Sequence, residues 1–181
     1  MKGRVAQWVA VPVLVVMIGF LVVLATSDVA GNDEDDSPLE GRQAPSITGE
    51  LLRGDGSFVL ADHEGEWVLV NFFATWCTPC VQEHPELVNF AERHEAAGDA
   101  SVVSVVYDAD EDNVRDFFED NGGDWPVIDD PEGRIALSYG VSGVPESYLI
   151  APNGVVVEKI TGGVTASGLD GLLARAKEAY R

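Results

Sequence analysis

The chain has 181 residues, of which 46% are apolar, so it can form one domain with a buried core plus accessory segments but not two full domains. Asp and Glu outnumber Lys and Arg by 31 to 11, and the formal net charge is −20. Because such a surface repels phosphate groups, we expect no nucleic-acid partner. The charge could favour basic partner proteins, but solubility or adaptation to salt is the favoured explanation, because net charge bears on solubility before it bears on function.

The chain begins with a segment that has the features of a membrane anchor. Residues 5–25 are almost wholly apolar, and a bilayer is crossed by roughly 20 such residues. Lys2 and Arg4 precede the run and acidic residues follow it, so the positive-inside rule places the N-terminus in the cytoplasm and the rest of the chain outside. We therefore predict a single-pass transmembrane anchor over residues 1–26. A cleaved signal peptide is the competing interpretation, although its apolar region would be shorter.

Two further regions follow the anchor. Residues 27–42 are rich in Asp, Glu, Gly, Ser and Pro and poor in apolar residues, so they cannot bury enough surface to offset the entropy cost of ordering. This composition predicts an acidic, flexible linker. Strand and helix patterns alternate from residue 43 to the end, and we predict one folded domain over residues 43–181.

The order of the predicted elements indicates an α/β fold with a mixed central sheet flanked by helices. Two nearly continuous apolar runs, residues 67–73 and 101–107, are typical of strands buried on both faces, and we expect them to be parallel. Other strands are expected over residues 57–60, 126–128, 147–151 and 155–161, the last two forming an antiparallel hairpin. Helices are expected over residues 78–97, 110–121, 131–139 and 165–180.

Cys77 and Cys80 are the only cysteines in the chain. A structural zinc site would need two more ligands at suitable spacing, and none is evident. A bridge between the two cysteines would close too short a loop to stabilise the fold. Redox chemistry is the remaining use for the pair, and we expect no metal and no cofactor beyond a Cys77–Cys80 disulfide.

The position of the two cysteines favours nucleophilic chemistry. They lie where a predicted buried strand ends and a predicted helix begins, and the free amide groups and dipole at a helix N-terminus stabilise a thiolate. Cys80 lies one helical turn after Cys77, on the same face, so it can attack a mixed disulfide formed at Cys77. Pro79 is tolerated in the first helical turn because its missing N–H would be unpaired there.

Two segments, VLVNFFATWCTPCVQEHPEL and YGVSGVPESYLI, resemble the thioredoxin-like proteins of the TlpA, ResA and DsbE/CcmG group. The resemblance extends from about residue 43 to the end. It implies a thioredoxin-like fold in a membrane-anchored, extracytoplasmic thiol–disulfide oxidoreductase. Many members of the group reduce the cysteine pair of apocytochrome c before haem attachment. The resemblance therefore implies protein substrates with cysteine pairs and a membrane thiol-transfer protein as electron donor.

The resemblance also implies roles for individual residues. Cys77 matches the attacking cysteine, Cys80 the resolving cysteine and Trp76 the aromatic residue that flanks them. Glu83 matches a glutamate that tunes the cysteines, since a carboxylate there would disfavour thiolates and could carry a proton. The alternative is that Glu83 is an exposed glutamate that stabilises the helix dipole. We expect His84, the next residue, to be exposed on the helix.

The second segment matches the loop that faces the cysteines in this fold. Pro145 matches a cis-proline, with an ordinary trans turn as the alternative. Val144 would offer its backbone to an extended substrate segment, as in strand addition. Glu146 matches an acidic residue typical of the group and is expected to bias substrate choice. Asn71 occupies the strand position where ordinary thioredoxins carry a buried Asp.

Three functions are compatible with these features. The leading hypothesis is a reductase of disulfides in other proteins. An oxidant of the same fold that introduces disulfides is the second, although no histidine lies between the cysteines, as it often does in strong oxidants. The third is a non-catalytic Cu(I)-binding chaperone module, because two thiolates can hold soft Cu(I).

Overall fold

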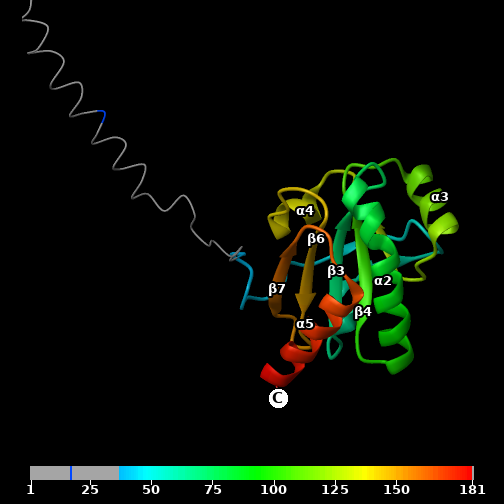
Figure 1. Cartoon of the computed structure of the whole chain (residues 1–181). Coiled ribbons are helices and arrows are strands. Elements are labelled where there is room, and N and C mark those ends of the chain that lie inside the picture. The colour runs from blue at the N-terminus through cyan, green and yellow to red at the C-terminus, as the bar shows by residue number, and fades with distance from the viewer. Residues whose placement is uncertain (1–16, 18–36, 181) are drawn as a thin grey trace, which may run out of the picture. The chain divides into compact units, whose positions relative to one another are not determined.

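The structure is a computed structural model that describes residue 17 and residues 37–180 (Figure 1). Apart from residue 17, the predicted anchor lies outside the described residues, as does the predicted linker up to residue 36. Within the part of the chain that is described, no helix is both long enough and apolar enough to span a bilayer.

A mixed five-stranded sheet forms the centre of the domain, with the strand order β5-β4-β3-β6-β7 (Figure 1). Strands β3, β4 and β5 are parallel, whereas β6 is antiparallel to both β3 and β7. The predicted mixed sheet, its parallel pair and its antiparallel hairpin are therefore confirmed. The strands are β3 (Val68–Phe73), β4 (Ser101–Val106), β5 (Val127–Asp129), β6 (Glu146–Ile150) and β7 (Val156–Thr161).

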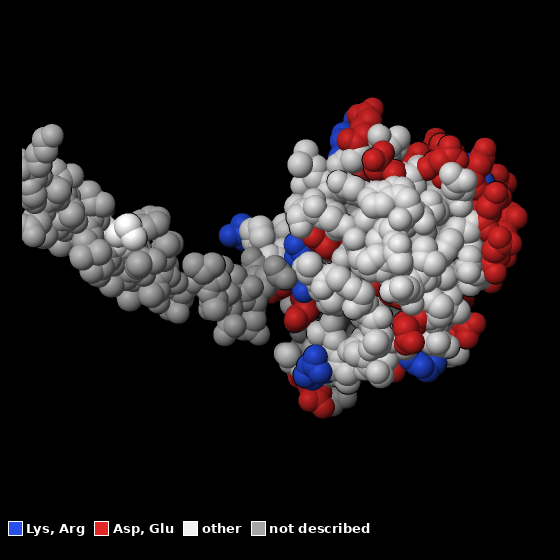
Figure 2. All heavy atoms as spheres, turned by 45° about the horizontal axis from the view of Figure 1, so that its top comes forward, with Lys and Arg blue, Asp and Glu red and all other residues white. Residues whose placement is uncertain are grey.

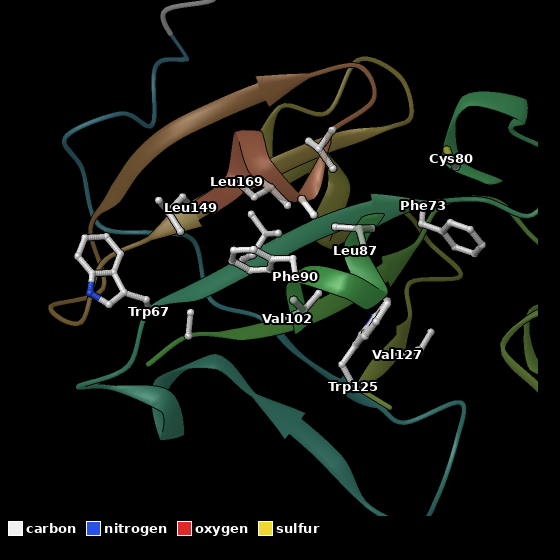
Figure 3. Close-up of a cluster of buried hydrophobic side chains, with 14 of the residues drawn as sticks. Trp67, Phe73, Cys80, Leu87, Phe90, Val102, Trp125, Val127, Leu149 and Leu169 are labelled. Atoms are coloured by element: carbon white, nitrogen blue, oxygen red, sulfur yellow. The ribbon is translucent and has the colours of Figure 1, made fainter. Parts of the chain in front are cut away.

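Helices cover both faces of the sheet, and alternate residues of β3 point to opposite faces. Leu69 and Phe73 pack with apolar residues of α2, α3 and α5, as Figure 3 shows for part of this cluster. Val70 and Phe72 pack instead with residues of α4 and of the segment that precedes β3. The helices are α2 (Thr78–Ala97), α3 (Glu111–Asn121), α4 (Arg134–Tyr139) and α5 (Ala166–Ala179), together with the short 3-10 helix η1 (Leu60–His63).

Three elements differ from the prediction, and one of them is the short helix η1, which was not predicted. Strand β1 (Thr48–Glu50) pairs antiparallel with β2 (Ser57–Val59) and was not predicted, because its three residues have no apolar alternation. Helix α4 begins at residue 134 rather than at residue 131. Gly133 has a left-handed backbone with φ of 63°, and the Asp130 carboxylate accepts hydrogen bonds from two amides in the first turn, so the helix cannot start earlier.

The segment before β1 runs along the outer strand of the sheet. The amide of Gly41 donates to the carbonyl of Val156, and the amide of Val156 donates to the carbonyl of Arg42. The carboxylate of Glu40 also accepts a hydrogen bond of 2.9 Å from the amide of Lys159. These bonds occupy backbone groups that would otherwise be unpaired on an edge strand.

Candidate active site

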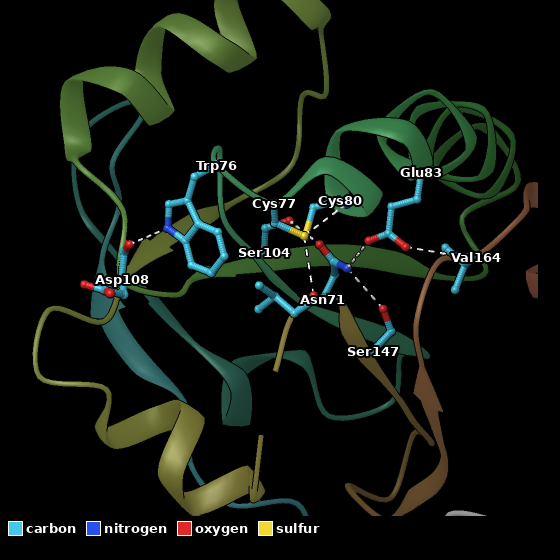
Figure 4. Close-up of a disulfide and its surroundings, with 10 residues drawn as sticks. Asn71, Trp76, Cys77, Cys80, Glu83, Ser104, Asp108, Ser147 and Val164 are labelled. Atoms are coloured by element: carbon cyan, nitrogen blue, oxygen red, sulfur yellow. Dashed lines mark hydrogen bonds between the residues drawn. A yellow bond between two sulfur atoms is a disulfide. The ribbon is translucent and has the colours of Figure 1, made fainter. Parts of the chain in front are cut away.

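The two cysteines lie where β3 passes into α2, as predicted. Cys77 is the N-cap of α2, and its Sγ accepts a hydrogen bond of 3.2 Å from the amide of Cys80 (Figure 4). Pro79 falls within the first turn, which contains no acidic residue. A negative charge on Cys77 would therefore meet a free amide and the positive end of a 20-residue helix.

The cysteines form a disulfide, with their Cα atoms 5.3 Å apart. Cys77 is 3% exposed and Cys80 is 0% exposed, so what little of the pair reaches the surface belongs to Cys77. Trp76 is 59% exposed beside this opening, and its indole N–H donates a 2.7 Å hydrogen bond to the carbonyl of Asp108 (Figure 4). Trp76 thus presents a fixed apolar surface next to the accessible sulfur.

The loop before β6 approaches Cys77 from the other side. The Val144–Pro145 peptide bond is cis, which agrees with the expectation from the resemblance. The carbonyl oxygen of Val144 lies 3.4 Å from the Sγ of Cys77. The structure therefore brings the cis-proline loop next to Trp76 and Cys77, from which it is far apart in the sequence.

Glu83 is buried, so the alternative of an exposed glutamate is wrong. Its side chain is 3% exposed, and its carboxylate accepts hydrogen bonds of 2.9 Å from the Asn71 amide group and from the backbone N–H of Val164 (Figure 4). Desolvation raises the pKa of Glu83 to about 7, because it outweighs the opposing effect of these two hydrogen bonds. The carboxyl group can therefore hold or release a proton near neutral pH, one helical turn beyond Cys80.

A row of polar side chains links Glu83 to the sheet. Asn71 lies opposite Ser104 of β4 and Ser147 of β6 in the strand register. The Asn71 amide donates to the hydroxyl of Ser147 at 3.1 Å, and the Ser104 hydroxyl accepts a 2.9 Å hydrogen bond from the indole of Trp125. From the sequence, neither serine nor Trp125 was assigned a role. The available signal was the presence of Asn71 and Ser104, which are polar residues inside the apolar runs 67–73 and 101–107.

His84 is buried, which corrects the prediction of an exposed residue. Its Nε2 lies 2.9 Å from the carbonyl of Gly122, to which it donates a hydrogen bond. Burial lowers the pKa of His84, which favours the neutral ring. The prediction overlooked that His84 follows Cys80 by four residues and therefore lies on the buried face of α2. Its ring contacts Phe73, Phe117, Phe118 and Trp125.

Glu146 is also buried, with 1% of its surface exposed. Its carboxylate contacts Ser142, Tyr148 and Lys159 rather than solvent. Any influence of Glu146 on substrate choice therefore acts through these neighbours.

A thioredoxin-like fold that places a Cys-X-X-Cys pair at a helix N-terminus, opposite a cis-proline loop, defines the class of thiol–disulfide oxidoreductases. The comparison with family models agrees, because the Redoxin model matches residues 39–173. The chain belongs to the Redoxin family, and it is a thiol–disulfide oxidoreductase with Cys77 and Cys80 as its redox pair.

Three similar proteins support this assignment. Thiol-disulfide oxidoreductase ResA of Bacillus subtilis is 31% identical over 92% of this chain and 91% of its own length. Thiol:disulfide interchange protein CycY of Rhizobium leguminosarum is 36% identical over 80% of this chain and 71% of its own. The crystal structure of a thiol:disulfide interchange protein of the thioredoxin family from Chlorobium tepidum has a TM-score of 0.67 and 29% identity, covering 74% of this chain and 94% of that one.

Proposed function

We propose that this protein reduces disulfides in other proteins outside the cytoplasmic membrane, with the cysteine pair of apocytochrome c as its substrate. The observation that carries the direction of electron flow is the buried carboxyl group of Glu83. A negative charge close to the cysteines disfavours thiolates and so opposes the stabilisation that the helix N-terminus would give to the reduced form of the pair. An unstable dithiol gives up its electrons readily, in contrast to strong oxidants, whose reduced form is stabilised.

The reaction transfers two electrons through a mixed disulfide. The thiolate of Cys77 attacks one sulfur of the substrate disulfide, a new S–S bond forms, and the other substrate sulfur leaves as a thiolate that takes up a proton. Cys80 then loses its proton to the carboxylate of Glu83 and attacks the Sγ of Cys77. The mixed disulfide breaks, the second substrate thiol leaves, and the Cys77–Cys80 disulfide remains.

The surroundings of Cys77 suit an extended polypeptide segment. The backbone of Val144 lies beside the sulfur and can pair with a substrate strand, as in strand addition. Trp76 offers an exposed apolar surface to the neighbouring substrate side chains. The resemblance to the TlpA, ResA and DsbE/CcmG group supports apocytochrome c as the protein that supplies this segment.

The location and the electron donor follow from the same proposal. Residues 5–25 tether the domain to the membrane, with the N-terminus in the cytoplasm. The predicted spacer of residues 27–42 ends before Glu40, because Glu40, Gly41 and Arg42 are hydrogen-bonded to β7. Disulfides persist in this oxidising compartment, so the oxidised protein needs a source of electrons. A membrane protein that passes thiol electrons outward fits that need.

Single-turnover kinetics test the proposal. The reduced protein is mixed with a peptide that carries a disulfide between two cysteines separated by two residues, followed by histidine, and free peptide thiols are counted. We expect one peptide disulfide reduced for each Cys77–Cys80 pair, and no reduction by the Cys77→Ser variant. Net oxidation of the reduced peptide by the oxidised protein at equimolar concentration would contradict the proposed direction.

A further inference from the structure

Glu146 directly follows the cis-proline and holds the loop that precedes it. The backbone N–H and the hydroxyl of Ser142 both donate to the same oxygen of Glu146, at 3.1 Å and 2.7 Å. Only one residue separates Ser142 from Val144, whose carbonyl approaches Cys77. The position of the Val144 backbone relative to the reactive sulfur therefore depends on the Glu146 carboxylate.

The other oxygen of Glu146 faces a lysine from β7. The Nζ of Lys159 lies 3.2 Å from this oxygen, and its side chain is only 12% exposed. The hydroxyl of Tyr148 lies 3.2 Å from the same oxygen. Burial, with the nearby Glu146 charge, raises the pKa of Tyr148, so its hydroxyl stays protonated. The buried carboxylate thus has a cation and hydrogen-bond donors on both oxygens, as a charge removed from water requires.

Strand geometry explains how these residues meet. Glu146 and Tyr148 are two positions apart on β6, so they point to the face opposite that of Ser147. Lys159 lies directly across from Tyr148 in the register of β6 and β7. The carbonyl of Pro145 also accepts a 2.9 Å hydrogen bond from the amide of Gly162, just beyond β7. Strand β7 is therefore attached to the loop at Pro145 and at Glu146.

We propose that Glu146 and Lys159 are positioning residues, which hold the Ser142–Pro145 loop against Cys77 and thereby set the affinity for polypeptide disulfides without touching the substrate. The inference rests on the proposed pairing of a substrate strand with Val144. A small disulfide makes no such pairing, so its reaction with Cys77 is insensitive to the exact position of the loop. The two kinds of substrate therefore separate a positioning role from general damage to the site.

The test uses the full-length protein in detergent and two oxidants, a peptide with an internal disulfide and oxidised glutathione. Lys159→Met is expected to raise the half-saturating peptide concentration about tenfold, the scale of one charged hydrogen bond. The rate with oxidised glutathione should stay within about twofold. The double variant Lys159→Met with Glu146→Gln should recover most of the affinity, because a buried amide needs no cation.

Two further variants complete the design. Lys177→Met is the matched control, because Lys177 also forms an ion pair with a carboxylate, that of Asp99 at 2.6 Å, but lies on α5. This variant should leave the reactions with the peptide and with oxidised glutathione unchanged. Ser142→Ala removes only the 2.7 Å hydrogen bond that the hydroxyl of this exposed residue donates to Glu146, and it should raise the half-saturating peptide concentration about threefold. This variant tests the inference independently if Lys159→Met fails to fold.

The outcomes separate this inference from the function on which it rests. The positioning role would be overturned if Lys159→Met slowed the reactions with the peptide and with oxidised glutathione equally. It would also be overturned if the double variant had as high a half-saturating peptide concentration as Lys159→Met, or if Ser142→Ala left that concentration unchanged. If the unaltered protein shows no saturation with the peptide and no preference for it over glutathione, the proposed strand pairing itself is wrong.

Discussion

At the scale of single residues, the proposed chemistry depends on how Glu83 takes up and releases its proton. The carboxyl group is buried three residues after Cys80, where it can accept the proton that the resolving cysteine must lose. The hydrogen bonds from Asn71 and Val164 fix its orientation. These contacts suit the proposed role of Glu83 as a buried proton acceptor for the redox pair.

Replacing Glu83 by Gln removes this proton acceptor while keeping the size of the side chain. We expect the resolution step, in which Cys80 releases the substrate, to slow by about 10²-fold, a typical effect of losing a general base. The inflection near pH 7 in the pH dependence of this step should also disappear. Quenched-flow detection of the mixed disulfide measures the step. An unchanged profile in the variant would assign the inflection to another group.

The same substitution has a consequence for stability. The pKa of Glu83 in the folded protein is about 7, above its ordinary value of 4.5, so between these values the folded state binds the proton more tightly. The stabilisation from protonation is complete below pH 4.5 and is lost as the pH rises through 7. The quantity to compare is the difference between the free energies of unfolding of the native chain and of Glu83→Gln. We expect this difference to fall by about 3 kcal/mol as the pH rises from 4.5 to above 7. Denaturant titrations at several pH values measure it, and a rising difference would refute the assignment.

At the scale of elements, the β1–β2 hairpin packs tightly over β5. The Cα of Gly49 lies so close to the buried Ile128 that an added Cβ would overlap the Ile128 side chain. We expect Gly49→Ala to lower the free energy of unfolding by about 1–3 kcal/mol through overpacking. Thermal and denaturant unfolding measure the change.

Gly171 provides the matched comparison for this prediction. It lies inside α5, where an added Cβ meets only the flexible end of Arg175 at 3.4 Å. Gly171→Ala should therefore stabilise the domain by up to about 1 kcal/mol through helix propensity. If both substitutions change stability in the same direction, the close packing of β1 on β5 is not the cause.

Sequence patterns predict these elements to different extents. The long apolar runs of β3 and β4 and the cysteine spacing identify the sheet centre and the redox pair, because burial on both faces leaves a continuous signal. The polar row of Asn71, Ser104 and Ser147 depends on strand register, which one sequence does not reveal. The spacing of His84 after Cys80 indicates its burial, whereas its aromatic contacts depend on how α3 packs over α2. The polar row and these contacts were missed because pairing between distant segments creates them.

At the scale of the whole molecule, charge is distributed unevenly. Figure 2 shows acidic side chains gathered along one edge of the domain, beside a broad uncharged surface. Helix α3 carries five acidic residues and one arginine. Just before this helix, the carbonyl of Asp108 accepts the hydrogen bond from the indole of Trp76, so the acidic helix lies near Trp76. A negative field therefore lies next to Trp76 and the proposed substrate surface.

This field should favour basic substrates. We expect a disulfide peptide with flanking lysines to react about tenfold faster than a matched peptide with flanking glutamates at low ionic strength. The ratio should approach one in about 1 M salt, where charges are screened within about 3 Å. Stopped-flow measurements at several salt concentrations test this. A ratio that does not depend on salt would show that the acidic edge does not steer the encounter.

The reduction potential of the Cys77–Cys80 pair tests the proposed direction of electron flow most directly. It is measured on the full-length protein in detergent, equilibrated with glutathione or dithiothreitol buffers, with Cys77→Ser as the background. A reductase tuned by Glu83 should have a potential near or below that of thioredoxin, about −270 mV. A potential near −120 mV, that of a strong oxidant, would contradict the proposal and make the protein a donor of disulfides.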